Sequence, residues 1–235
     1  MIFQLAVALL LATAPPTLRS RAVDDRFWTY VVDPAAARIE LVYARADGTR
    51  YGSLGAVADD AAARGERLLF ATNGGMYHED RAPVGLFVDD GREEARLVTR
   101  AGPGNFGWKP NGVFAVRRDG RAEVVDTDAW RGAGALFATQ SGPLLLSKGV
   151  MHDGFEPGSR HVNVRSGVGV RRDGRVVFAM SKGLVTFHAF ATYLRDLGCD
   201  DALYLDGHIS RVYWPDGGVT DRGGDFGVII AVYGR

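Results

Sequence analysis

The sequence predicts a protein of the α+β class, in which a mixed, mostly antiparallel sheet core is built from hairpins and a few helices pack against it. Three observations lead to this prediction. The 235 residues include 31 glycines, and such a high content favours many tight turns. Asp-Gly pairs at 90–91, 119–120 and 173–174 each lie between apolar stretches, which is the pattern of a β-hairpin. Helical spacing of apolar residues occurs in few places.

The elements of the first half are predicted from apolar runs separated by turn residues. Alternating residues predict strands, and an alanine-rich run with charges on one side predicts a short helix. In chain order we expect two strands within 27–41 joined through Asp33-Pro34, a helix over 56–67, a buried strand over 68–72, a hairpin of 83–88 with 95–99, and a hairpin of 111–116 with 121–125.

The second half continues in the same way. A third hairpin joins 168–170 to 176–180, and its string VRRDGR also occurs at 116–121. We interpret the shared string as convergence on a good type I′ Asp-Gly turn rather than as an internal duplication. The clearest helix is 186–197, which ends at Gly198. Apolar strands are expected over 202–205 and 226–233.

Composition limits both the architecture and the class of partner. With 46% hydrophobic residues, residues 25–235 are expected to form one globular domain. The 28 basic and 28 acidic residues cancel, and the arginines are dispersed, so no nucleic-acid partner is predicted. The single cysteine, Cys199, excludes a disulfide framework and a cysteine-based zinc site, and we expect it to be a small buried filler.

Residues 1–20 resemble a signal peptide. The apolar run from Ile2 to Ala12 is too short to span a bilayer, and Ala12-Thr13-Ala14 fits a small-residue cleavage site. The segment lacks a basic residue before Arg19, so an uncleaved apolar arm is the alternative. We predict export to the periplasm or the extracellular space, with no stable membrane span after processing.

Five polar or glycine-rich turns follow or precede apolar strands. Glycine-rich turns bring backbone amides close to a ligand, arginine and lysine bind phosphate or carboxylate, and hydroxyls and amides bind sugar oxygens. Together the turns suit an anionic, hydroxyl-rich ligand. They are Asn73-Gly74-Gly75, Lys109-Pro110-Asn111-Gly112, Gln140-Ser141-Gly142-Pro143, Arg165-Ser166-Gly167 with Ser181 in the adjoining turn, and Asp206-Gly207-His208 with Ser210 and Arg211.

In this order and spacing the turns resemble the phosphodiester glycosidase family, the exported bacterial branch in particular. The strings that carry the resemblance are ATNGGMY at 71–77, PNGVF at 110–114, QSGP at 140–143, RSGVG at 165–169 and YLDGHIS at 204–210. Many members have Asp-Gly-Gly-Gly-Ser where this chain has Asp206-Gly207-His208-Ile209-Ser210. This departure concerns the substrate more than the fold.

The resemblance implies hydrolysis of a sugar-1-phosphodiester, similar to an N-acetylglucosamine-1-phosphodiester, at the sugar C1–O bond. The substrate would be a small molecule or a polymeric phosphoglycan. The phosphate leaving group has a conjugate acid with a pKa of about 6, so it needs less protonation than an ordinary alkoxide. The site instead needs cations and amides for the phosphate charge, and one carboxylate to activate water or attack the anomeric carbon.

We assign the roles as follows. Asp206 is the predicted carboxylate, and His78, Glu79 and His208 are predicted proton carriers; His188, between two phenylalanines on the predicted helix, is better explained by packing. Cations that would hold the phosphate are Arg165, Arg211 and Lys109. The residues expected to line the pocket are Asn73, Gly74, Gly75, Asn111, Ser141, Gly142, Ser181, Gly207 and Ser210.

Two alternatives stay open at this point. Asp206, His208, His78 and Glu79 could form a mixed oxygen and nitrogen site for a divalent metal, although no recognised ligand spacing is present and no other cofactor is predicted. The same pocket could also serve a noncatalytic domain that binds envelope glycans, or a metal-dependent phosphodiesterase that cleaves P–O.

Overall fold

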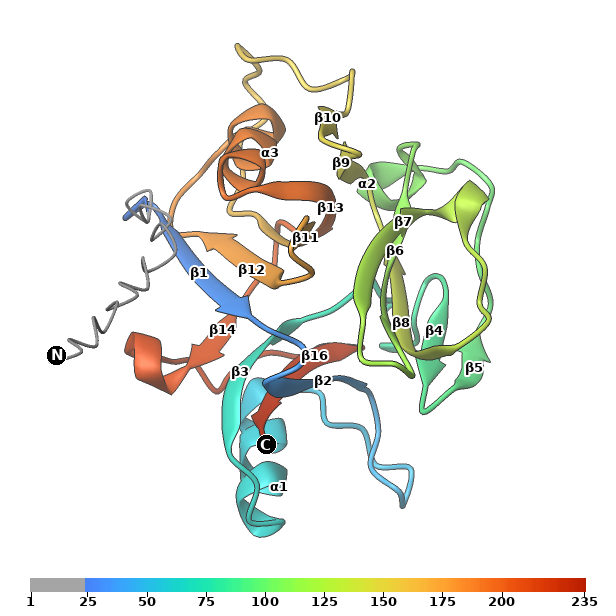
Figure 1. The fold of residues 1–235 in the computed structure, drawn as a ribbon, viewed down its shortest axis with the longest axis vertical. Helices are drawn as coiled ribbons and strands as arrows, with labels where there is room; N and C mark the ends of the chain where they lie inside the picture. Colours follow the sequence, from blue (N-terminus) through green and yellow to red (C-terminus); the bar gives the residue numbers. More distant parts are fainter. Residues whose placement is uncertain (1–23) are drawn as a thin grey trace, which may run out of the picture.

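The computed structural model describes residues 24–235, which fold into three antiparallel sheets with three α-helices (Figure 1). The predicted class is therefore confirmed: the described chain is mostly β with a few helices. The predicted signal-peptide-like segment, residues 1–20, lies outside the described residues. No helix among residues 24–235 is long and apolar enough to cross a membrane.

The first sheet has six strands and packs against α3 (Phe187–Asp196). Its central strand β13 ends at Asp206, one of the predicted site residues. In spatial order the strands are β1 (Phe27–Val32), β12 (Val176–Ser181), β11 (Ser166–Arg171), β13 (Cys199–Asp206), β9 (Leu144–Ser147) and β10 (Val150–Met151).

The second and third sheets have five strands each. The second is β15 (Val219–Thr220), β14 (Val212–Trp214), β3 (Leu68–Asn73), β16 (Ile229–Gly234) and β2 (Ala37–Val42). The third is β5 (Arg92–Ala95), β4 (Phe87–Asp89), β8 (Ala135–Ser141), β6 (Gly112–Arg117) and β7 (Ala122–Asp126), followed by the 3₁₀ turn η1 (Thr127–Ala129). The short α2 (Gly104–Gly107) precedes β6, and the 3₁₀ turn η2 (Pro215–Gly217) precedes β15.

A single aromatic cluster shows where the three sheets meet. Phe178 of β12 packs against Phe70 of β3, with ring centroids 5.2 Å apart, and against Phe114 of β6 at 6.0 Å. All three rings are buried in one hydrophobic core. Because burying such a ring contributes about 1.5–3 kcal/mol, this core is a main reason the three sheets hold together.

Both longer helices begin at a side-chain cap. Thr186 Oγ1 accepts the Ala189 N–H at 3.0 Å, and Gly198, with φ of +87°, follows the end of α3, as the sequence predicts. The helix α1 (Leu54–Ala63) begins two residues before the predicted start because Ser53 Oγ caps the Ala56 N–H. It also ends well before Arg67.

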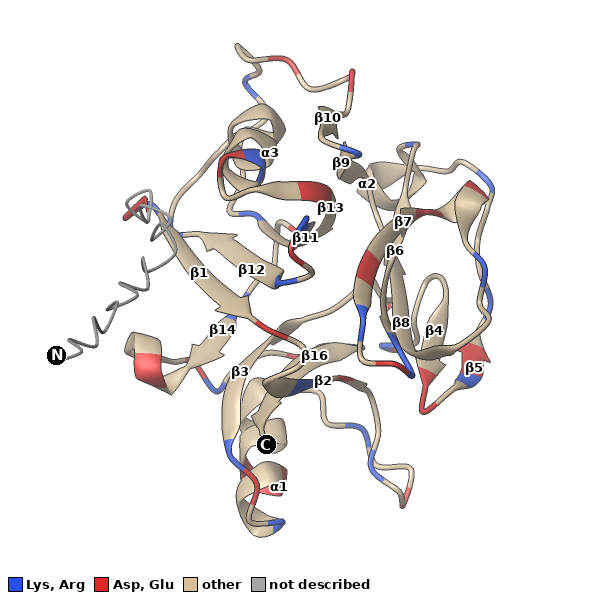
Figure 2. Ribbon diagram, in the orientation of Figure 1, with Lys and Arg blue, Asp and Glu red and all other residues tan. Residues whose placement is uncertain are grey.

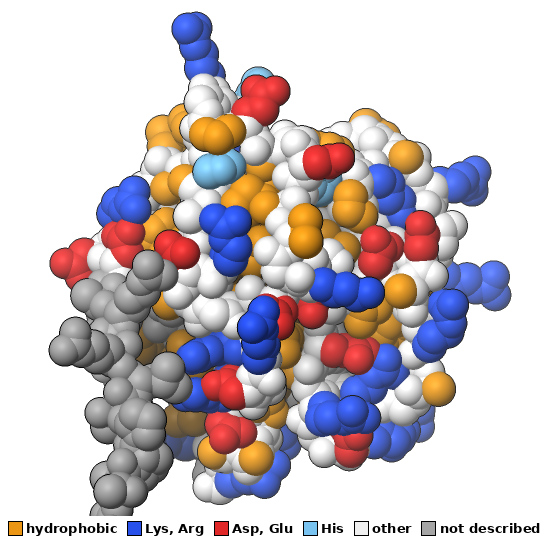
Figure 3. Space-filling model, turned by 45° about the horizontal axis from the view of Figure 1, so that its top comes forward, with side chains coloured by type: hydrophobic (Ala, Val, Ile, Leu, Met, Phe, Trp, Pro, Cys, Tyr) orange, Lys and Arg blue, Asp and Glu red, His pale blue; other side chains and the backbone are white. Residues whose placement is uncertain are grey.

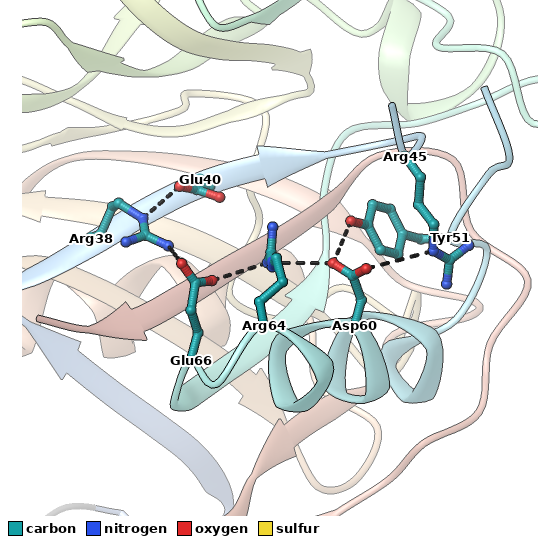
Figure 4. Close-up of polar contacts among 7 residues, drawn as sticks. All are labelled: Arg38, Glu40, Arg45, Tyr51, Asp60, Arg64 and Glu66. Carbon is teal, nitrogen blue, oxygen red and sulfur yellow. Dashed lines mark hydrogen bonds and ion pairs between the residues drawn. The ribbon is translucent and has the colours of Figure 1, made fainter. Parts of the chain in front are cut away.

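Ion pairs fix the exposed side of α1 to the second sheet (Figure 4). Asp60 accepts a hydrogen bond from the Tyr51 hydroxyl at 2.8 Å, and Arg64 lies 3.4 Å from the same carboxylate. Arg64 also pairs with Glu66, which in turn accepts a hydrogen bond from Arg38 of β2 at 2.8 Å. Charges of both signs are spread over the rest of the ribbon (Figure 2), as the balanced composition predicts.

The three Asp-Gly hairpins exist, but the type I′ turn occurs at Asp90-Gly91 and not at the two VRRDGR hairpins for which it was predicted. Asp90 and Gly91 both have positive φ, at +44° and +77°, and the strands they join are short, Phe87–Asp89 and Arg92–Ala95. Around Asp119 and Asp173 only the following glycine has positive φ, and the aspartate side chain accepts the N–H two residues on. These two turns are wider loops closed by a glycine, so the type I′ prediction is wrong for them.

Candidate functional site

Three strand ends, one from each sheet, meet at one place. Asn73 ends β3, Ser141 ends β8 and Asp206 ends β13. The Ser141 hydroxyl donates to the Leu205 carbonyl at 3.3 Å. Asn73 Nδ2 donates to Ser166 Oγ at 3.3 Å, and that hydroxyl lies 3.3 Å from the Asp206 carbonyl oxygen. The structure thus brings together residues from four of the five predicted turns.

The turn that follows Asp206 is not a hairpin turn, although an Asp-Gly pair allows one. β13 belongs to the first sheet and β14 to the second, so the segment crosses between sheets. Asp206 Oδ2 accepts the N–H of Ile209 at 2.7 Å and that of His208 at 3.3 Å. This turn fixes the carboxylate, while no described residue forms a hydrogen bond with Oδ1.

A cleft of about 290 Å³ opens beside this carboxylate. Its walls combine the glycine turn after β3 with the turn after β13, as the sequence predicts. The Gly74 N–H is not available to a ligand, because it donates to the Val228 carbonyl at 2.8 Å. The lining residues are Asn73, Gly74, Gly75, Met76, Tyr77, Leu205, Asp206, His208 and Ile209.

Arg165 lines a second pocket, of about 430 Å³. Its side chain is 1% exposed, and its guanidinium carbon lies 3.5 Å from the centre of the Phe187 ring. Nε donates to the Val185 carbonyl at 3.0 Å and Nη2 to the His161 carbonyl at 3.1 Å. Nη1 is buried without a partner.

The charge of Arg165 has no carboxylate to balance it among residues 24–235. It forms none of the ion pairs there, and both of its side-chain acceptors are neutral carbonyls. Burial lowers the pKa of Arg165, since a buried cation loses its hydration. A buried, unbalanced cation with one free N–H is suited to an anionic ligand.

The larger pocket has an aromatic wall at the top of the molecule. Trp108, Phe155 and Phe187 line it together with polar side chains, and Figure 3 shows histidine and hydrophobic side chains next to one another on that part of the surface. His188, assigned to packing from the sequence, also lines this pocket. Sequence reasoning missed the wall because its residues come from separate segments without a shared motif.

Each of the two pockets has a lining residue at the same end of one strand pair. Ser166, which follows Arg165, pairs with Asp206 in the register of β11 and β13. Tyr204, two residues before Asp206, packs its ring 4.8 Å from Phe187. Arg165, directly before β11, and Asp206, at the end of β13, are therefore close in the sheet.

Most predicted hydroxyl ligands are already bonded within the protein. Ser181 Oγ donates to the Gly183 carbonyl at 2.8 Å and accepts the Arg165 N–H at 2.9 Å. Ser210 Oγ lies 2.9 Å from Ser166 Oγ and 3.1 Å from the Asp206 carbonyl oxygen. With Ser141, these serines hold the strand ends in place and line neither pocket.

The half-buried Lys109 forms a separate cluster with the buried Asn111 and Gly142. Asn111 Oδ1 accepts hydrogen bonds from Lys109 Nζ at 2.7 Å and from the Thr127 hydroxyl at 2.8 Å. A side chain on Gly142 would come within 2.6 Å of Asn111 Cβ. These predicted ligands therefore pack against one another and line neither pocket.

The four remaining predicted residues are not among those that line the cleft. The Arg211 guanidinium pairs with Asp221 at 2.8 Å, while its backbone N–H donates to Asn73 Oδ1. His78 and Glu79 lie exposed on the turn after β3 and do not line the cleft. Gly207 lies beneath the cleft, where an added Cβ would come within 2.0 Å of the Tyr204 hydroxyl oxygen.

The hypothesis of a metal site formed by Asp206, His208, His78 and Glu79 is not supported by their positions. Within residues 24–235, no group of three or more His, Cys, Asp or Glu side chains is placed to hold a metal ion. Asp206 and His208 share the cleft, whereas His78 and Glu79 do not reach it.

Known proteins share both sequence and fold with this chain. A family profile described as phosphodiester glycosidase matches residues 66–226. The uncharacterized protein YigE of Escherichia coli is 34% identical over 223 residues, covering 94% of this chain and 84% of that protein.

Solved structures of low sequence identity share the fold. The catalytic domain of zebrafish N-acetylglucosamine-1-phosphodiester alpha-N-acetylglucosaminidase, auto-inhibited by its pro-peptide, is 14% identical with a TM-score of 0.61, covering 91% of this chain and 85% of that one. A putative exported protein from Burkholderia pseudomallei is also 14% identical, with a TM-score of 0.58 and coverage of 87% and 73%.

Proposed function

The chain belongs to the phosphodiester glycosidase family, and we propose that it hydrolyses the C1–O bond of a sugar-1-phosphodiester, releasing a free sugar and a phosphomonoester. A substrate similar to an N-acetylglucosamine-1-phosphodiester is the first choice, since the similar zebrafish enzyme is named for that activity. The group beyond the phosphate is either small or part of a polymeric phosphoglycan.

The observation that carries this proposal is the buried guanidinium of Arg165. A charge buried without a carboxylate is unfavourable unless a ligand supplies the opposite charge. A phosphodiester supplies one negative charge, and its departure as a phosphate creates a second. Arg165 therefore interacts more strongly with the transition state than with the substrate, which is the requirement for catalysis.

Asp206 supplies the carboxylate at the sugar. Its Oδ2 accepts two backbone N–H groups, Oδ1 accepts none from the described residues, and the residue lines the cleft. There it acts on the anomeric carbon, as a general base toward water or as the nucleophile. The sugar then occupies the cleft with Asn73 and Gly75, and the phosphate lies toward Arg165.

We place this activity outside the cytoplasm. The support is the signal-like segment at residues 1–20 together with the similarity to a Burkholderia protein described as exported. Envelope or exported phosphoglycans are the substrates available there.

The test is hydrolysis of an alpha-N-acetylglucosamine-1-phosphodiester in oxygen-18-labelled water, with wild type, Asp206→Asn and Asp216→Asn. Asparagine can still accept the two turn N–H groups, so Asp206→Asn should fold and yet lose about 10²- to 10⁴-fold in rate. Asp216 is exposed on η2 and serves as the control. We expect the label in the sugar.

Three results would contradict the proposal. Label in the phosphate would mean P–O cleavage, as in a phosphodiesterase. Binding of the substrate without turnover by the wild type would mean a glycan-recognition domain. An unchanged rate for Asp206→Asn would remove Asp206 from the chemistry.

A further inference from the structure

Two buried polar groups lie close together, and neither has a hydrogen-bond partner among the described residues. The first is Nη1 of Arg165, and the second is the hydroxyl of Tyr204, a residue that no sequence argument selected. Tyr204 is 0% exposed and its hydroxyl has no hydrogen-bond partner. A buried hydroxyl without a hydrogen-bond partner destabilises the fold, so native proteins seldom keep one without a use.

The two groups share one wall. The Arg165 guanidinium carbon lies 3.5 Å from the centre of the Phe187 ring and 5.6 Å from that of the Tyr204 ring. The Tyr204 and Phe187 rings meet edge to face, 4.8 Å apart. Packing of the Phe187 and Tyr204 rings thus holds the guanidinium and the hydroxyl in position without supplying either with a hydrogen bond.

The Tyr204 hydroxyl also reaches the turn that carries the catalytic carboxylate. A Cβ on Gly207 would come within 2.0 Å of this hydroxyl oxygen, so the absence of a side chain at Gly207 makes room for it. Gly207 directly follows Asp206. The hydroxyl therefore lies near both Arg165 and the turn that holds Asp206.

We propose that Tyr204 and Arg165 form a two-donor receptor for the phosphate group, in which the phenol O–H and the Arg165 Nη1 each donate a hydrogen bond to a nonbridging phosphate oxygen. This rests on the proposed function, because that function places a phosphodiester at Arg165. The anion enters from the 430 Å³ pocket that Arg165 lines, and Arg165 Nη2 keeps its hydrogen bond to the His161 carbonyl.

The electrostatics keep the phenol in its donor form. Burial raises the pKa of Tyr204, and the Asp206 charge raises it further, while Arg165 acts in the opposite direction. A neutral phenol at working pH adds no negative charge beside the phosphate. No proton leaves Tyr204 in this role; it donates a hydrogen bond before, during and after C1–O cleavage.

The experiment measures anion binding separately from turnover. Methyl phosphate, a phosphomonoester of the product type, is titrated by calorimetry into wild type, Tyr204→Phe and Tyr193→Phe. Tyr193 is a matched control because its hydroxyl is also buried, but it lies 2.6 Å from Thr29 Oγ1 in a hydrogen bond away from the pockets.

We expect Tyr204→Phe to weaken methyl phosphate binding about 10- to 100-fold, the loss typical of one hydrogen bond to a charged group. Its thermal stability should not fall, because the lost hydroxyl has no partner in the free protein. Tyr193→Phe should do the opposite, with lower stability and unchanged affinity. Hydrolysis of the sugar phosphodiester should fall in kcat for Tyr204→Phe and not for Tyr193→Phe.

Equal affinity of wild type and Tyr204→Phe for methyl phosphate would contradict the proposal that Tyr204 binds the phosphate group. A second outcome separates the two proposals. If Tyr204→Phe weakens methyl phosphate binding but the wild type does not hydrolyse the sugar phosphodiester, the proposed function is wrong and the phosphate receptor is supported. If Tyr204→Phe does not fold, the wild type labelled with carbon-13 at tyrosine Cζ gives the answer. The Tyr204 signal should then shift on adding methyl phosphate and not on adding chloride, and an unmoved signal would contradict the receptor.

Discussion

Arg165 is a side chain whose placement favours binding over stability. Moving a guanidinium out of water costs several kcal/mol, and its hydrogen bonds to two neutral carbonyls offset only part of this desolvation penalty. The aromatic face of Phe187 returns a little more, since a cation over a ring is worth about 0.5–2 kcal/mol. A free energy deficit therefore remains in the free protein, and an anion would remove it.

This leads to a prediction for Arg165→Met. Replacing a buried charge by an apolar side chain of similar length is often neutral for stability, so the melting temperature should change by no more than a few degrees. Hydrolysis should fall at least about 100-fold, because a charge-assisted contact to phosphate is lost. Thermal melts and initial rates on the sugar phosphodiester measure the two effects.

A ligand control accompanies this variant. Adding methyl phosphate should raise the melting temperature of the wild type and leave that of Arg165→Met unchanged, since only a ligand that binds the native state stabilises it. Equal stabilisation of both proteins would place the anion elsewhere.

Gly207 has no room for a side chain, because the Tyr204 hydroxyl lies close to its backbone. Gly207→Ala would place Cβ 2.0 Å from the Tyr204 hydroxyl oxygen and 3.1 Å from the Val164 carbonyl oxygen. We expect a loss of about 1–3 kcal/mol in the free energy of unfolding, measured in urea, as for other overpacked sites. Adding Tyr204→Phe should restore much of the loss, because it removes the atom that clashes.

Gly183→Ala is the control for this pair, because a Cβ there would meet nothing within 4 Å. It should change the stability by less than about 0.5 kcal/mol. If Gly207→Ala and the double variant unfold at the same urea concentration, the hydroxyl does not occupy this space.

At the scale of elements, the three hairpins differ in the conformation of their turns. The three Asp-Gly pairs look alike in the sequence, yet only Asp90-Gly91 adopts the two-residue type I′ turn. At the other two, the aspartate caps the N–H two residues on and only the glycine has positive φ. The flanking arginines extend these loops, which local sequence does not distinguish from the tight form.

The helix α1 depends on the ion-pair chain shown in Figure 4. Its centre is Asp60, 22% exposed at the side chain, which accepts from Tyr51 and lies near Arg64 and Arg45. Burial raises the pKa of Tyr51 to about 12, and the hydrogen bond to Asp60 adds to this, so the phenol stays a donor. The pairing joins α1 to the loop before it.

We predict that Asp60→Ala lowers the free energy of unfolding by about 1–2 kcal/mol, measured in urea, since it leaves the Tyr51 hydroxyl without its acceptor. Asp59→Ala is the matched control on the next position of the same helix. Asp59 is 75% exposed in its pair with Arg222, and such surface pairs contribute about 0–1 kcal/mol. Equal losses for the two variants would contradict the central role of Asp60.

At the scale of the whole molecule, the site exists because three sheets end at the same place. Phe178 and its neighbours pack the sheets together from the inside. Asn73 then links two of them at the surface of the core, through Nδ2 to Ser166 and through Oδ1 to the Arg211 N–H at 3.3 Å. The carboxylate of Asp206 is placed by this junction and not by its own strand alone.

Asn73→Ala tests this junction. The variant leaves the Arg211 N–H without its acceptor and Ser166 without one donor, so we expect about 1–3 kcal/mol less stability in urea. The rate of hydrolysis should fall as well, because Asp206 moves relative to Arg165. Ser147→Ala, exposed on β9, is the control and should alter neither quantity. A stable variant with a normal rate would show that the junction does not position the site.

The sequence by itself determined the α+β class, both longer helices and the strands that lead to the site. Period-two and helical patterns, caps and glycines are local signals, and they place Asp206 at a strand end and Thr186 at a helix start without tertiary knowledge. It also placed Asn73, Gly74, Gly75, Asp206 and His208 in what proved to be one cleft.

The tertiary structure decided which polar residues are free to act. Ser141, Ser181 and Ser210 look like ligands in the sequence but form hydrogen bonds to the backbone or, for Ser210, also to Ser166. Tyr204 looks like a core residue in an apolar strand, yet its hydroxyl has no partner. Hydrogen bonds between distant segments are not encoded in local patterns, so whether a polar group is satisfied follows only from how the three sheets pack.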